Sequence, residues 1–151
     1  MKPQFIKSNV KRDIVAELKE KFGIAGLPYL LSESGREKLR GFSGHLSKDE
    51  IAELAQMLNI DTIGIYILKK EKDGLRLGFD ATKLLRKQIS KNIIEINETQ
   101  LAQWIRGHDL EIKIPQGTYV ISHKGDFLGC GRSNGNVLFN YVPKERRIKK
   151  P

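Results

Sequence analysis

The stretch GDFLGCGRSNGNVLFNYVPKERRIKK, residues 125–150, gives the strongest fold signal in the chain. Apolar residues at 127–130 alternate with glycines, and residues 137–142 are rich in β-branched and aromatic side chains, so both segments are predicted strands. Asn134-Gly135 between them is typical of a hairpin turn, because asparagine and glycine tolerate a positive φ. Pro143 has no N–H to pair and therefore ends the second strand.

A cluster of cations follows this hairpin. They are Lys144, Arg146, Arg147, Lys149 and Lys150, with Glu145 as the one acid among them. A hairpin that leads into such a cluster is suited to binding a polyanion, because lysine and arginine neutralise phosphates and release counterions. The alternative is a solvated basic tail without a binding role.

Two motifs in this region carry a family resemblance. Residues 127–131 (FLGCG) and 140–144 (NYVPK) resemble the end of a PUA domain, most of all the PUA-type extension of Nop/Sun-type RNA cytosine-5 methyltransferases. The N-terminal half is similar in position and size to the pre-PUA domain of Nip-type ribosome-biogenesis factors. The resemblance implies an α+β protein, with a small α/β pre-PUA-like domain over residues 1–90 and a PUA-like mixed β-barrel over residues 91–151. It also implies an archaeal origin.

Composition narrows the class of partner and the compartment. The 151 residues include 27 Lys and Arg against 18 Asp and Glu, a net charge of +9, which favours nucleic acid or an anionic surface as the partner. The single cysteine, Cys130, excludes an internal disulfide and favours a reducing compartment. No apolar run approaches the roughly 18–20 residues of a membrane span. We therefore expect a cytoplasmic protein without a membrane partner.

The spacing of apolar residues and the positions of capping and turn residues predict the other helices and strands. Apolar spacings of three and four predict helices over residues 10–22, 51–58, 81–90 and 99–105. Their expected caps are Ser8 or Asn9 with Gly23 for the first, Ser47 with Glu50 for the second, Asp80 for the third, and Asn97 with Gly107 for the fourth. Strands are predicted over residues 27–31, 36–42, 62–68, 75–79, 92–96, 110–112 and 119–122. The domain boundary is expected between residues 88 and 93.

The sequence does not indicate an enzyme, a metal site or a cofactor. It has no glycine-rich dinucleotide or phosphate loop at a strand-to-helix turn, and His45, His108 and His123 lack metal-ligand spacing. In the methyltransferases that this chain resembles, the cysteine nucleophile belongs to a Rossmann-like catalytic domain. Cys130 is therefore expected to be a small buried strand residue. An RNA-modifying enzyme would instead need titratable groups in a pocket, for example near His45, Asp80 or His108.

The expected function is non-catalytic RNA binding in rRNA or tRNA modification or ribosome biogenesis. A basic PUA face would dock structured RNA for an RNA-modifying enzyme or a pre-ribosomal particle. The candidate RNA-binding residues are Arg146 and Arg147, then Lys144, Arg132, Arg106, Lys149, Lys150, Tyr141, Lys83 and Lys87. For Tyr141 the alternative is a core aromatic, and for Lys83 and Lys87 it is a solvated helix face. The alternative function is a protein–protein adaptor in a ribosome-assembly complex, whose main interaction would depend little on salt.

Overall fold

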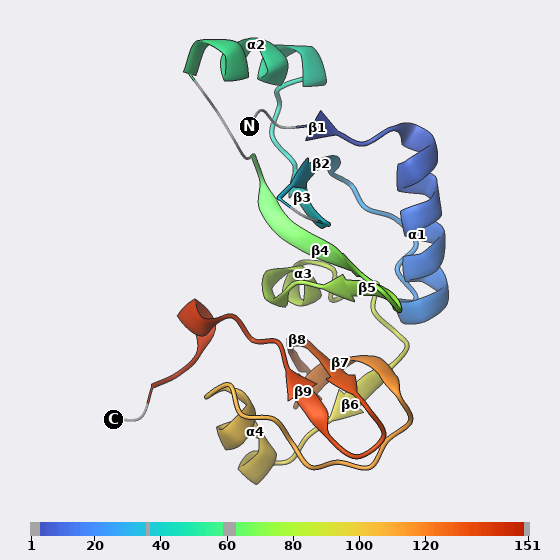
Figure 1. Ribbon diagram of the computed structural model, residues 1–151, viewed down its shortest axis with the longest axis vertical. Helices are drawn as coiled ribbons and strands as arrows, with labels where there is room; N and C mark the ends of the chain where they lie inside the picture. Colours follow the sequence, from blue (N-terminus) through green and yellow to red (C-terminus); the bar gives the residue numbers. More distant parts are fainter. Residues whose placement is uncertain (1–3, 36, 59–62, 150–151) are drawn as a thin grey trace. The chain divides into compact units, whose positions relative to one another are not determined.

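The computed structural model describes residues 4–35, 37–58 and 63–149 (Figure 1). Contacts divide the chain into two compact units, Met1–Arg76 (unit 1) and Leu77–Pro151 (unit 2). Each unit combines one sheet with helices, which agrees with the α+β class predicted from the sequence. Among the described residues, no helix is long and apolar enough to cross a membrane.

Unit 1 contains a five-stranded sheet in the order β1-β2-β3-β4-β5. The strands are β1 (Gln4–Phe5), β2 (Leu30–Ser34), β3 (Lys38–Phe42), β4 (Ile65–Glu71) and β5 (Gly74–Leu77). Its helices are α1 (Ser8–Phe22) and α2 (Lys48–Leu58). Helix α1 lies beside the sheet in Figure 1 and buries Ile14, Leu18 and Phe22, which are the apolar positions expected from the helical spacing.

The ends of these helices test the cap assignments. Ser47 and Glu50 form the predicted capping box, with Glu50 N–H donating to Ser47 Oγ (3.1 Å) and Ser47 N–H donating to Glu50 Oε1 (3.2 Å). Gly23 ends α1 in the left-handed conformation with φ 83°, also as predicted. The prediction that Ser8 or Asn9 caps the start of α1 was wrong. Lys7 is the N-cap residue, and its side chain makes no capping bond. The predicted strand starts at residues 36 and 62 lie outside the described residues.

Helix α1 also covers the edge strand of this sheet. Glu17 Oε2 accepts a 2.7 Å hydrogen bond from the backbone N–H of Leu75, and Lys21 Nζ donates at 3.0 Å to the Leu75 carbonyl. Strand β5 is the last strand of the sheet, so side chains of α1 take up backbone groups that an added strand would otherwise pair with.

Unit 2 contains a four-stranded mixed sheet in the order β6-β7-β8-β9. The strands are β6 (Ile93–Glu95), β7 (Gly117–His123), β8 (Asp126–Ser133) and β9 (Leu138–Asn140), and the helices are α3 (Phe79–Leu84), α4 (Glu98–Trp104) and the 3₁₀ turn η1 (Lys144–Arg146). Strands β6 and β7 are parallel, and the other two pairs are antiparallel. Asn97 caps α4 through a complete capping box with Gln100, and Gly107 follows with φ +90°, as the sequence indicates.

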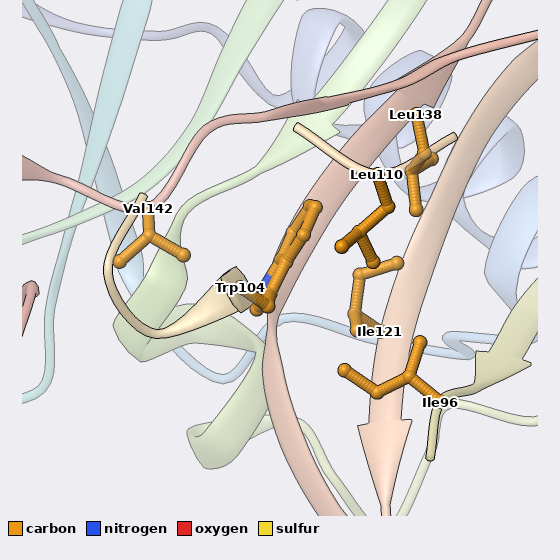
Figure 2. Close-up of a cluster of buried hydrophobic side chains, with 6 residues drawn as sticks. All are labelled: Ile96, Trp104, Leu110, Ile121, Leu138 and Val142. Atoms are coloured by element: carbon orange, nitrogen blue, oxygen red, sulfur yellow. The ribbon is translucent and has the colours of Figure 1, made fainter. Parts of the chain in front are cut away.

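Trp104 lies in the core cluster of unit 2 and is fully buried. Its neighbours in the cluster are Ile96, Leu110, Ile121, Leu138 and Val142 (Figure 2). Figure 2 shows the indole between Val142 on one side and Leu110, Leu138 and Ile121 on the other. The indole Nε1–H donates to the Leu128 carbonyl at 2.9 Å, which satisfies its polar atom inside the core.

Two predictions in unit 2 were wrong. The helix expected over residues 81–90 is the shorter α3, with Gly78 rather than Asp80 as its N-cap. Residues 85–88 form turns, and Leu85 within them and Ile89 just after them are still buried. The strand expected over residues 110–112 is a single bridge from Leu110 to Leu138. It does not extend, because the next hydrogen-bonded partner in antiparallel register is Asn136, whose N–H donates to Asn134 Oδ1 in the turn at 2.9 Å.

Helix α3 belongs to the same compact unit as the second sheet. It contacts β8, and unit 2 accordingly begins at Leu77, whereas the sequence suggested a boundary at residues 90 and 91. The difference arises because the buried side of α3, with Ala81 and Thr82, packs on this sheet.

Candidate nucleic-acid interface

The basic segment after Pro143 is folded onto unit 2. We call residues 143–149 the C-terminal strap. The backbone N–H of Ile148 donates to the Ile105 carbonyl at 2.8 Å, just after α4. Arg147 Nε donates to the Val142 carbonyl at 3.0 Å, and the Arg146 N–H bonds to the Pro143 carbonyl at 2.9 Å within η1. The strap is therefore held at several points, unlike the solvated tail that was the alternative.

Arg146 forms an ion pair with helix α3. Its Nη2 lies 3.0 Å from Asp80 Oδ2, and the two side chains are 52% and 47% exposed. An ion pair this exposed stabilises the fold weakly, by about 0–1 kcal/mol, because water screens it. The pair nevertheless orients the guanidinium, which remains open to solvent for a second anionic partner.

Arg147 has a different environment from Arg146, although the sequence ranked them together. A Cβ added at Gly107 would lie 2.4 Å from Arg147 Nε and 2.5 Å from its Cδ, so the arginine side chain passes directly over this glycine. Arg147 is only partly exposed and bonds to Val142, as described above. Its contacts indicate that it fixes the strap against the end of α4. Gly107 is needed there both for its φ of +90° and for the space.

The remaining predicted cations lie around the strap and on α3. Arg106, Lys144, Lys149, Lys83 and Lys87 are exposed, and Arg132 is partly exposed on β8. The bond from Ile148 to Ile105 brings Arg106 beside the strap, although the two segments are far apart in the sequence. Lys150 lies outside the described residues.

A second basic site lies at the other end of α3. Lys83 and Arg86 line a cavity of about 310 Å³ with Asp126, Phe127 and Leu128. Lys83 Nζ lies 4.8 Å from the centroid of the Phe79 ring, a cation–π geometry. Because residues three apart on a helix are neighbours, Lys83 lies one turn from Asp80, and α3 links this cavity to Arg146.

Strand β9 and the residue that follows it present aromatic rings to solvent. Tyr141 is 38% exposed, so the alternative that it is a core aromatic was wrong. Phe139 is 37% exposed, and we did not single it out from the sequence. The strand alternation of residues 137–142 contained the signal, because Phe139 and Tyr141 are two residues apart and share a face.

A cluster of titratable groups occupies the β6–β7 end of unit 2. His123 Nδ1 lies 2.8 Å from the Ile96 carbonyl, and its Nε2 lies 3.1 Å from Glu98 Oε1. The carbonyl bond, and then Glu98, raise the pKa of His123 above its usual value. Bonds from Lys124 and then His123 lower the pKa of Glu98. The backbone N–H of Lys124 also lowers the pKa of Glu95.

The residues considered for catalysis or metal binding are not brought together. His45 and His108 are exposed, Asp80 is paired with Arg146, and Cys130 is a buried β8 residue as expected. Within the described ranges, no group of three or more His, Cys, Asp or Glu side chains could hold a metal ion.

Comparisons with known proteins identify a family for most of unit 2. Residues 91–148 match the family model described as the methyltransferase RsmF PUA domain. The ribosomal RNA small subunit methyltransferase F of Vibrio cholerae is 26% identical over 135 residues, which cover 88% of this chain. The protein of the same name from Shewanella piezotolerans is 29% identical over 146 residues, which cover 93% of this chain.

This chain spans only 28% and 29% of the lengths of these two relatives. Both relatives are bacterial, so the archaeal origin implied by the resemblance finds no support. The PUA-type module expected from the FLGCG and NYVPK motifs is confirmed, because both motifs fall inside the matched segment. The chain therefore contains, at residues 91–148, a PUA domain of the type found in the methyltransferase RsmF.

Proposed function

We propose that unit 2 docks structured RNA on the C-terminal strap and the neighbouring Arg106, and that this docking serves ribosomal RNA modification. The relatives named above are ribosomal RNA methyltransferases, and the matched family is their PUA domain. The net charge of +9 supplies the attraction to phosphate. Folded RNA is recognised mainly through its shape, its backbone and its 2′-hydroxyl groups, which suits an exposed cluster of lysine and arginine.

The observation that carries this proposal is the anchoring of the strap. Exposed Lys144, Arg146 and Lys149 project from a segment that bonds to Ile105 and Asp80, so their backbone is ordered before RNA arrives. Because the strap is already ordered, it loses less conformational entropy on binding RNA than a flexible tail with the same charges would.

The proposal has finer parts. We propose that the described residues bind RNA without catalysing a reaction, and that a methyltransferase active site elsewhere performs the chemistry. We also propose that the protein acts in the cytoplasm.

Two further parts concern the fold. Unit 1 would correspond to a pre-PUA domain, and the unit 2 sheet would close into a barrel. The reciprocal bonds between Leu110 and Leu138 (3.0 and 2.8 Å) support closure, because they continue the pairing beyond β9.

A protein–protein adaptor is the second candidate. It is favoured by the apolar end of α2 in unit 1, where Met57 and Leu58 are 79% and 65% exposed. Exposed apolar groups of this kind are typical of surfaces that contact another protein.

A salt titration with matched variants tests the main proposal. Small-subunit rRNA fragments and tRNA would be titrated with the wild-type protein and with Arg106→Ala/Lys144→Ala/Arg146→Ala. The control, Lys19→Ala/Lys48→Ala/Lys72→Ala, removes the same charge from unit 1. We expect steep salt dependence in the wild type and a slope reduced by about 0.9 per lost phosphate contact in the unit 2 variant only. Equal losses in both variants, or no binding at moderate salt, would reject the strap as the docking site.

A further inference from the structure

The side chain between Phe139 and Tyr141 is anchored to the core, and this fixes the side to which the Phe139 ring points. Asn140 Nδ2 donates to the Trp104 carbonyl at 2.8 Å and to the His108 carbonyl at 3.0 Å, and its Oδ1 accepts from the Val142 N–H at 2.7 Å. These bonds hold Asn140 toward the end of α4. Because successive side chains of a strand alternate, Phe139 in β9 points to the opposite, solvent side. Tyr141 follows the strand, in the turn that the bond between Asn140 Oδ1 and the Val142 N–H closes, and its ring is also exposed.

Strand register identifies what lies beside the rings. Phe139 is directly opposite Arg132, and Arg132 is directly opposite Thr118. Directly opposed residues share a face, so Thr118, Arg132 and Phe139 form one row across three strands. The adjacent pair, Ser133 with Leu138, is buried on the core side, which confirms that the row faces outward.

Cations flank the exposed rings on both sides. Arg132 lies on the neighbouring strand, and Lys144 and Arg146 follow Tyr141 within the strap. Two exposed aromatic side chains among cations are poorly suited to an apolar protein partner. They are suited to an RNA strand, whose bases stack on rings while its phosphates meet lysine and arginine.

We propose that Phe139 and Tyr141 form a stacking platform for an unpaired RNA base, with Arg132 beside it. The proposal rests on the RNA docking proposed above and adds the kind of RNA structure recognised: a loop, bulge or single-stranded end next to a helix. The strap holds the backbone without regard to sequence, whereas the platform requires a base that is not paired. Stacking of one base on an aromatic ring is worth about 5- to 150-fold in affinity.

The test compares three RNA probes. The first is a hairpin with an unpaired loop, the second is the same hairpin with abasic sites in the loop, and the third is a blunt duplex with the same stem. The protein variants are Phe139→Leu, Tyr141→Leu and Phe139→Tyr. The control, Leu84→Ala, removes exposed apolar area elsewhere in unit 2, where Leu84 is 54% exposed. Thermal unfolding of each variant checks that it is folded.

We expect Phe139→Leu and Tyr141→Leu each to weaken hairpin binding about 5- to 150-fold and to change duplex binding less than about twofold. Phe139→Tyr and Leu84→Ala should bind the hairpin like the wild type. Abasic sites should weaken the wild type by a similar factor and leave the two leucine variants nearly unchanged.

Other outcomes separate the platform from the proposed function. If the wild type binds intact and abasic hairpins equally, or if the leucine variants weaken duplex and hairpin alike, the platform is rejected while RNA docking stands. If the wild type binds none of the probes, both the platform and the RNA-docking function are rejected.

Discussion

The backbone N–H of Gly129 donates a hydrogen bond to the hydroxyl of Thr82 across 3.1 Å. Thr82 lies on α3 and is fully buried, and its own hydroxyl donates to the Phe79 carbonyl at 2.7 Å. Gly129 belongs to the FLGCG motif, and a Cβ added there would lie 2.9 Å from Phe79 Cδ2. Helix α3 precedes the segment matched by the PUA model, but it is hydrogen-bonded to β8, the strand that contains the FLGCG motif.

Replacing Thr82 with valine tests this connection. Valine has nearly the same shape but cannot accept the Gly129 N–H, and an unpaired buried donor costs about 1–3 kcal/mol. We expect the free energy of unfolding in urea to fall by that amount. Thr82→Ser keeps the hydroxyl and should lose less stability than the valine variant. Equal stability of the valine variant and the wild type would show that the bond contributes nothing.

Gly107→Ala should release the strap. The added Cβ would collide with the Arg147 side chain, and the φ of +90° is strained for alanine. The matched control is Gly135→Ala, where φ is +103° but no atom lies within 4 Å of the added Cβ. Both variants should lose about 1–3 kcal/mol of stability through strain, measured by urea unfolding.

Only Gly107→Ala should also weaken RNA binding and expose the strap to limited proteolysis. The double variant Gly107→Ala/Arg147→Ala removes the collision, so its stability loss should be smaller than the sum of the single losses. Additive losses would contradict the packing of Arg147 on Gly107.

His123 should make the stability of unit 2 depend on pH. Both ring nitrogens face oxygen acceptors, and the raised pKa of His123 means that the folded state favours the imidazolium. The stabilisation is therefore complete below the unfolded pKa of about 6.5 and is lost as pH rises through the higher folded pKa. Unfolding free energies measured from about pH 5.5 to 8.5 should show this decline in the wild type.

His123→Gln should remove the decline, because glutamine does not titrate. Glu98→Gln should reduce it without abolishing it, since the Ile96 carbonyl is the larger cause of the raised pKa. An unchanged pH profile in His123→Gln would show that another group produces the dependence.

Glu17→Ala should expose the β5 edge of unit 1. It removes the acceptor for the Leu75 N–H, a bond to a charged group worth about 1.5–3 kcal/mol. We expect lower stability in urea and concentration-dependent self-association by size-exclusion chromatography. Glu17→Gln keeps an acceptor oxygen and should behave much more like the wild type. A monomeric, fully stable Glu17→Ala protein would contradict the capping role.

Local signals in the sequence predicted much of this fold. The Ser47 capping box, the Asn97 cap and the Gly107 stop were found because each depends on residues three or four apart. The shorter extent of α3 was missed because it depends on packing against β8, which is distant in sequence.

The candidate site also has features that local sequence predicts and features that depend on residues distant in the sequence. The sequence located the cations of the strap, but it could not separate Arg146 from Arg147, because Gly107 and Asp80, which distinguish them, are 40 or more residues away. Phe139 was missed, and for Tyr141 the alternative of a core aromatic stayed open, for a related reason. The outward direction of the Phe139 ring follows from the bonds of Asn140 to α4.

The pairing of Leu75 with Glu17 and Lys21 also limits how unit 1 can recruit other molecules. A peptide that added itself to β5 would first have to displace a carboxylate and an ammonium group from the Leu75 backbone. Recruitment through main-chain pairing is therefore disfavoured at this edge, and side-chain recognition, such as the exposed Met57 and Leu58 of α2 offer, becomes the easier route.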